Sequence, residues 1–241
     1  VMRFGGERMK ALYQLFKIDE DTCLQSRMLS HGIENAQKTI EGRNFGIRKS
    51  VLQYDDVMNR QRELIYTQRN QVLDGEDIHE TVGKMINGFI ESEVKHYCAD
   101  ETADDWNIEG LRKLFGGWLL QDNDLVYSND DLNTLEVEDI VSTIQQRASE
   151  LYVAREEEYS SEVMRELERV MHLKSVDTNW MEHIDAMDQL KQGINLRAYG
   201  QHNPLIEYRN EGYDMFSAIT DAIREQTARL VLTVKIRKNE E

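Results

Sequence analysis

Proline, cysteine and long apolar runs are nearly missing from this sequence. One proline and 14 glycines in 241 residues are too few for an all-β fold, which needs a turn signal about every ten residues. No apolar stretch approaches the roughly 18 residues of a membrane-spanning helix, and the first residues show no signal-peptide pattern. We therefore expect a cytosolic helical protein whose two cysteines, Cys23 and Cys98, are reduced thiols.

Basic residues are also scarce, with 29 Lys and Arg against 45 Asp and Glu, a formal net charge of −16. Nucleic-acid binding needs clustered Lys and Arg against the phosphates, so the composition argues against a nucleic-acid partner. The excess is local, because residues 74–158 carry 22 acidic and 6 basic side chains while the flanking parts nearly cancel. This change in charge predicts a separate subdomain in the middle of the chain, with a solvated acidic surface.

One long helix is predicted ahead of the acidic region, over about 21–73. Apolar residues recur there from Leu24 to Ile65 in steps of mostly three, four or seven, which is the spacing of one face of an α-helix. About fifty residues in one helix would span roughly 75 Å. Gly42 and Gly46 are its weak points, since each costs about 1 kcal/mol relative to alanine. Shorter helices are predicted after it, at about 77–100, 108–120 and 137–158.

Two further apolar stripes, at 163–194 and 216–234, flank the stretch "INLRAYGQHNPL", which holds the only proline. Each helix buries its stripe most cheaply against the other, which predicts an antiparallel hairpin with arms of about 45–50 Å. The last residues, "LVLTVKIR", also alternate like a strand. Gly200 and Pro204 explain the bend between the two arms. The expected fold is all-α: a long helix, an inserted helical subdomain and a two-helix hairpin.

Motifs of catalysis are missing from the sequence. It contains no G-x-x-x-x-G-K-[ST] phosphate loop, no H-E-x-x-H and no paired C-x-x-C. The nearest metal-like group is His183 with Asp185 and Asp188, but His183 lies on a different helix face from Asp185, so we interpret the group as a solvated helix surface. A metal site at His183 in an unrelated coiled-coil enzyme is the alternative. We interpret Trp180 as a large anchor that packs the hairpin on the long helix.

Two long blocks resemble the SecA preprotein-translocase motors. "EGRNFGIRKSVLQYDDVMNRQRELIY" (41–66) is similar to the long helix of their helical scaffold domain. "DTNWMEHIDAMDQLKQGINLRAYGQHNPLIEYRNEGYDMF" (177–216) is similar to their two-helix finger. The resemblance is ordered along nearly the whole chain and is weakest at 76–150, where the variable helical wing domain would fall.

The resemblance implies a division of the chain into four parts. Residues 1–22 would be the tail of a second nucleotide-binding domain, 23–75 the long scaffold helix, 76–160 the helical wing and 161–241 the two-helix finger. The finger tip would contact the translocated polypeptide through Tyr199, with Leu196, Arg197 and Gln201 as neighbours. Trp180, Met187 and Asp188 would serve scaffold packing and the restraint of ATP hydrolysis.

The family's partners and cofactors are likewise implied by the resemblance alone. A SecA motor pushes unfolded preproteins through the SecYEG channel, and its own nucleotide-binding domains hold ATP and Mg²⁺. We therefore expect no cofactor, metal or catalytic residue in this chain, which by itself would not hydrolyse ATP. The full-length motor would be cytoplasmic and peripheral, on the anionic inner face of the bacterial plasma membrane.

The chain also departs from the family pattern. His202 and Asn203 stand where Lys and Asp are common, which puts in doubt any salt bridge at the tip. Gly46 replaces a usual Asp, Gly200 replaces a common Ala, and the cysteine-rich zinc tail is missing. A purely structural and regulatory module, which clamps the ATPase domains without touching substrate, is the alternative function.

Overall fold

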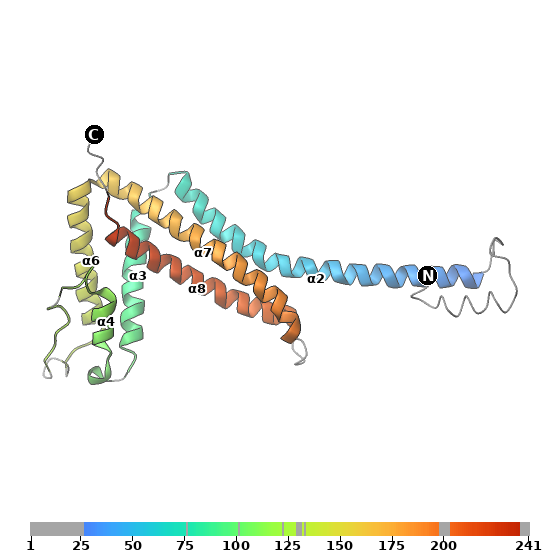
Figure 1. Ribbon diagram of the computed structural model, residues 1–241, viewed down its shortest axis with the longest axis horizontal. Coiled ribbons are helices and arrows are strands. Elements are labelled where there is room, and N and C mark those ends of the chain that lie inside the picture. Colours follow the sequence, from blue (N-terminus) through green and yellow to red (C-terminus); the bar gives the residue numbers. More distant parts are fainter. Residues whose placement is uncertain are drawn as a thin grey trace. The chain divides into compact units, whose positions relative to one another are not determined.

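The described part of the chain is helical. The structure is a computed structural model that describes residues 27–75, 77–100, 102–121, 123–128, 132, 134–197 and 203–236. Within these ranges there are six α-helices, one 3₁₀ turn and no β-strand, so the predicted all-α fold is confirmed. The helices are α2 (Arg27–Leu73), α3 (His79–Tyr97), α4 (Ile108–Phe115), α6 (Val137–Tyr159), α7 (Ser161–Arg197) and α8 (Pro204–Thr233), with the 3₁₀ turn η2 at Ala103–Asp105 (Figure 1).

The chain divides into two compact units, residues 1–58 and 59–241. In the first unit the described residues belong to α2, and no side chain between residues 30 and 58 is buried. Local pairs support this helix, such as the ammonium of Lys38 at 2.8 Å from the carboxylate of Glu34. The predicted weak points, Gly42 and Gly46, do not interrupt it. This unit therefore has the apolar spacing of a packed helix, yet its apolar side chains are not buried.

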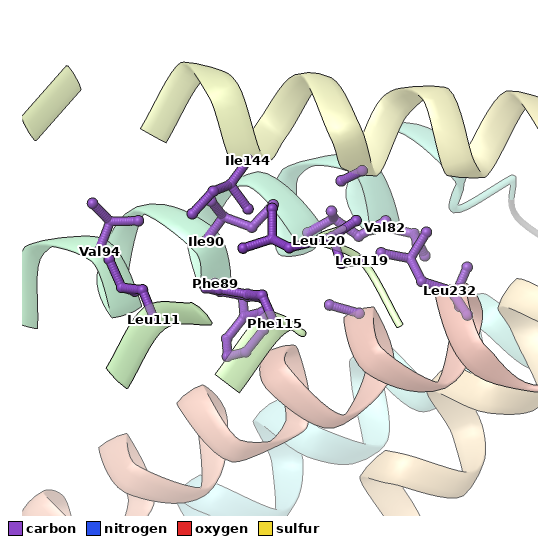
Figure 2. Close-up of a cluster of buried hydrophobic side chains, with 14 of the residues drawn as sticks. Val82, Phe89, Ile90, Val94, Leu111, Phe115, Leu119, Leu120, Ile144 and Leu232 are labelled. Carbon is purple, nitrogen blue, oxygen red and sulfur yellow. The ribbon is translucent and has the colours of Figure 1, made fainter. Parts of the chain in front are cut away.

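The second unit is built around one apolar core (Figure 2). Helices α3, α4, α6, α7 and α8 contribute side chains at helical spacing, so each presents one face inward. Phe89 and Phe115 meet edge to face with ring centroids 5.7 Å apart, an arrangement aromatic pairs favour. Each fully buried side chain of this size contributes about 1.5–3 kcal/mol. The core includes Val82, Ile86, Ile90, Val94, Leu111, Ile140, Ile144, Met164, Val231 and Leu232.

Local signals set the ends of the shorter helices. The side chain of Asn107 caps α4 by accepting from the Gly110 amide at 2.9 Å, and Glu136 with Asp139 forms a capping box at the start of α6. The helix predicted to run to residue 120 ends at Phe115, because Gly116 is extended with ψ 148° and the chain then turns at Gly117 with φ +78°, a conformation that glycine adopts without strain. At the end of α3, burial raises the pKa of the free thiol of Cys98 to about 11.

A single residue, Ser160, connects α6 to α7. Its φ of 85° and ψ of 154° lie in a region that side-chain-bearing residues rarely adopt. A polar network crosses this corner, with Arg165 of α7 2.5 Å from the carboxylate of Glu156 and 2.9 Å from that of the fully buried Glu168. Tyr152 of α6 donates to Glu168 at 2.8 Å. Apolar packing and these bonds together hold the strained corner in place.

Candidate functional site

Helices α7 and α8 form the predicted antiparallel hairpin and lie side by side along their length (Figure 1). Their 37 and 30 residues correspond to about 55 Å and 45 Å of helix. Pro204 occupies the first turn of α8, as expected. The side chain of Asn203 accepts from the Leu205 amide at 3.0 Å and so caps α8. An Asp at position 203 could make the same cap, so the departure to Asn keeps this role.

The turn of the hairpin lies largely outside the described residues. Leu196 and Arg197 belong to the last turn of α7, where the structure describes their backbone and not their side chains. Tyr199 and Gln201 fall within 198–202, outside the described residues. The described part of the hairpin therefore fixes the two helix ends between which these residues lie.

Trp180 sits between α7 and the long helix. Its ring is buried and meets the edge of Tyr66 of α2 at a centroid distance of 6.3 Å. The indole N–H has no hydrogen-bond partner among the described residues. Met187, two turns further along α7, is also buried, whereas Asp188 is exposed and accepts from Gln192 at 2.8 Å. Of the three residues predicted for this face, two point inward.

His183 does not lie on a solvated surface, and that prediction was wrong. Its side chain is 2% exposed, and its Nε2 lies 2.8 Å from Oε1 of Gln61 on α2. Gln61 in turn donates through Nε2 to the backbone carbonyl of Gly212 on α8 at 2.9 Å. Burial lowers the pKa of His183. The surface prediction failed because α7 is covered on more than one side, so a polar residue outside its apolar stripe is also buried.

Two more polar contacts join the hairpin to its neighbours. Arg69 of α2 forms a two-pronged ion pair with Asp177, at 2.8 and 3.3 Å, and the hydrogen bond to Asp177 is the main cause that raises the pKa of the guanidinium. Asn179 donates to Gln226 across the two arms at 2.6 Å. Sequence reasoning missed Gln61, Tyr66 and Gly212, because their partners lie more than a hundred residues away and no local pattern marks them.

Among the described residues no three His, Cys, Asp or Glu side chains gather to hold a metal ion, so His183, Asp185 and Asp188 do not form such a group. None of the described helices combines the length and the apolar character needed to cross a membrane.

Comparison with known proteins gives one consistent result. A family model for the SecA wing and scaffold domain matches residues 23–235. Protein translocase subunit SecA 1 of Alkaliphilus metalliredigens is 46% identical over 233 residues, which is 96% of this chain and 26% of the relative. The SecA subunit of Acetivibrio thermocellus is 41% identical over 98% of this chain and 26% of the relative, and that of Syntrophomonas wolfei is 39% identical over 97% and 28%. The chain thus spans about a quarter of the length of these relatives.

Proposed function

This chain belongs to the SecA wing and scaffold domain family, and from that premise we propose that it is the non-catalytic, polypeptide-contacting part of a protein-translocating ATPase. In this proposal the hairpin is the finger, and its turn contacts the translocated preprotein and the mouth of the SecYEG channel. ATP and Mg²⁺ would be held by the nucleotide-binding domains of the longer protein, at the inner face of the membrane.

The observation that carries the proposal is the reach of the hairpin beyond the core. Leu173 is the last residue of α7 that packs against the core, and the helix continues to Arg197. Those 24 residues correspond to about 36 Å of helix. Contacts with α2 join the hairpin along this stretch, from Arg69 at Asp177 to Gln61 at His183 and Gly212. The 14 residues of α7 beyond His183 correspond to about 21 Å of helix, and a turn held this far from a fixed base is suited to entering a partner.

Tyrosine is a suitable residue for the end of such a lever. Its ring makes apolar contact with side chains of many kinds, and its hydroxyl can donate to or accept from an extended backbone. A grip through Tyr199 would therefore not depend on the sequence of the polypeptide that is moved. Leu196, Arg197 and Gln201 would complete the contact surface.

The nucleotide-binding domains are the partner we propose for the first unit. Ile33, Ile40, Ile47 and Val51 are all exposed, and their spacing places them within about 40° on one helix face. Phe45 and Leu52 form a second exposed stripe about 125° around the helix. Contiguous apolar surface of this kind is typical of a docking face.

A photo-crosslinker at position 199 in a full-length SecA carrying this segment tests the polypeptide contact. We expect a crosslink to a translocating preprotein, and we expect Tyr199→Ala to lower translocation strongly while the unfolding midpoint stays unchanged. Tyr213 is the matched control, because it is a tyrosine on the same hairpin and is 71% exposed. Equal crosslinking at 199 and 213, or full transport by Tyr199→Ala, would contradict the proposal.

The second candidate function, regulation of the ATPase without substrate contact, is favoured by the position of Trp180. Its burial against Tyr66 joins the hairpin to the long helix on which the ATPase domains would dock. Under this function Trp180→Ala or Met187→Ala should raise basal ATP hydrolysis, and Tyr199→Ala should change neither hydrolysis nor transport. Measuring both activities on all three variants separates the two functions, and both functions can operate together.

A further inference from the structure

The side chain of Gln61 on α2 bonds to both arms of the hairpin. It is 7% exposed, its amide nitrogen lies 2.9 Å from the Gly212 carbonyl oxygen of α8, and its amide oxygen lies 2.8 Å from Nε2 of His183 on α7. The Arg69–Asp177 pair is more exposed and joins α2 to α7 alone. The Gln61 contact is therefore the better candidate for fixing the hairpin on α2.

Hydrogen-bond chemistry determines the protonation of His183 at this contact. A carbonyl oxygen only accepts, so the NH₂ of Gln61 must face Gly212 and its oxygen must face His183. The Nε2 of His183 therefore carries the hydrogen that it donates to Gln61. Its Nδ1 is buried without a partner among the described residues, so a second proton there would find no acceptor. The ring is neutral, with the hydrogen on Nε2.

No charged side chain is among the identified contacts of this ring. Gln61 comes from α2, Trp180 from α7 at a centroid distance of 5.6 Å, and Phe216 from α8 at 5.9 Å. Of the titratable groups nearby, Tyr66 of α2 contacts Trp180, and Glu182 and Asp185 on α7 are exposed. The protonation of the His183 ring thus depends on its burial and on the Gln61 amide that it faces.

We infer that Gln61 is a positioning residue for the hairpin, which sets the tautomer and ring orientation of His183 and thereby the register of α7 and α8 on the long helix. The importance of this register for transport rests on the proposed function, in which the hairpin acts as a lever on a fixed base. The buried indole N–H of Trp180 and Nδ1 of His183 have no partner in the described part of the chain, and they offset what the two Gln61 bonds contribute. The contact therefore specifies a position more than it adds stability.

Nitrogen NMR of the ¹⁵N-histidine-labelled 241-residue chain reads the tautomer without any variant. We expect His183 as the pure Nε2–H form at neutral pH, with its signal assigned by its loss in His183→Gln. Gln61→Leu should convert it to a mixture of tautomers. Gln68→Leu, the same change at an exposed position two turns along α2, should leave it unchanged. An Nδ1–H form in the unaltered chain would overturn the inference.

Gln61→Glu separates the two bonds, because a carboxylate can accept from His183 but cannot donate to Gly212. An opposite charge at this distance favours the protonated ring, so the protonation constant of His183 should rise about tenfold or more. The Nε2–H bond should be retained even though the Gly212 bond is lost. An unchanged protonation constant would show that residue 61 does not face the ring, and would also overturn the inference.

Spin labels at two exposed positions, Arg62 on α2 and Asp185 on α7, report the register directly. The distance distribution should broaden in Gln61→Leu and stay narrow in Gln68→Leu and in Tyr199→Ala. A lower unfolding midpoint with an unchanged distribution would mean a merely structural role and would overturn the inference. These measurements need no translocation, so a failure of Tyr199→Ala to affect transport would refute the proposed function and leave them unaffected.

Discussion

Two phenylalanines illustrate the difference between the two units. Phe45 in the first unit is 70% exposed, and Phe115 in the second is completely buried between Phe89 and Trp118. Both lie at apolar positions of amphipathic helices, so the sequence pattern around them predicts the same thing. The second unit supplies its own cover for its apolar faces, whereas no side chain of residues 30–58 of α2 is buried. Periodicity thus identifies a face that needs cover without identifying what covers it.

Hydrogen exchange should show the largest difference between the two units. Backbone amides of α3, α6 and α8 lie around the core and should exchange only through global unfolding. Amides at 30–58 should exchange orders of magnitude faster, since helices without tertiary packing are marginally stable in water. Equal protection in both regions, measured by mass spectrometry on the 241-residue chain, would refute the comparison.

Removing each phenyl ring in turn measures the same difference as free energy. Phe115→Ala should lower the free energy of unfolding by about 3–5 kcal/mol, because it leaves a cavity in the core. Phe45→Ala should change it by less than about 0.5 kcal/mol, as is usual for an exposed position. Urea denaturation followed by tryptophan fluorescence provides both values. Similar losses from the two variants would mean that Phe45 is packed in solution.

Acid should weaken the second unit through two buried histidines. Burial lowers the pKa of His172 and His183, so the unfolded chain binds protons more readily than the folded chain. Their stability contribution is complete above about pH 6.5 and is lost as pH falls from there toward the lowered folded values. The loss is at most about 1.4 kcal/mol per pH unit for each histidine.

Denaturation between pH 7.5 and 5.5 tests this dependence. His172→Gln and His183→Gln should each make the free energy of unfolding less dependent on pH, because each removes one group that takes up a proton on unfolding. Gln68→Asn is the matched control, because this exposed change alters no titratable group and should leave the slope unaltered. A slope unaffected by all three changes would assign the acid sensitivity to carboxylates instead.

Relief of backbone strain at Ser160 gives the smallest expected change in stability, and this change is an increase. Ser160→Gly should stabilise the chain by about 1 kcal/mol, because glycine adopts φ 85° without the penalty that serine bears. Ser161→Gly, in the first turn of α7, should instead destabilise it by up to about 1 kcal/mol. The thermal unfolding midpoints of these two variants should therefore shift in opposite directions. A lower midpoint for Ser160→Gly would place the strain elsewhere.

The sequence predicted the positions of the helices better than it predicted which of their side chains are buried. Spacing and caps identified the hairpin and the first residue of α8, because both depend on neighbours within one or two turns. Gly117 ended α4 earlier than its apolar spacing predicted, since a positive φ outweighs periodicity. The apolar stripe of α7 also omitted Glu168, His172 and His183, which are all buried.

Those three polar residues share a reason for having been missed. Glu168 pairs with Arg165 and Tyr152, His172 lies against Thr227, and His183 faces Gln61. Burial of a polar side chain is favourable only when a partner is present, and two of these partners lie on other helices far along the sequence. For Tyr199 and Gln201, the sequence and its family resemblance remain the basis of the prediction.

The paired arms of the hairpin also restrict how its length can change in evolution. One extra turn in each arm would move the tip outward by about 5.4 Å with its orientation kept. A single inserted residue in α7 would rotate the part of that helix beyond it by about 100° about the helix axis. Insertions and deletions in the two arms must therefore be matched and come close to whole turns. The length of the hairpin can thus change only in steps of about one helical turn.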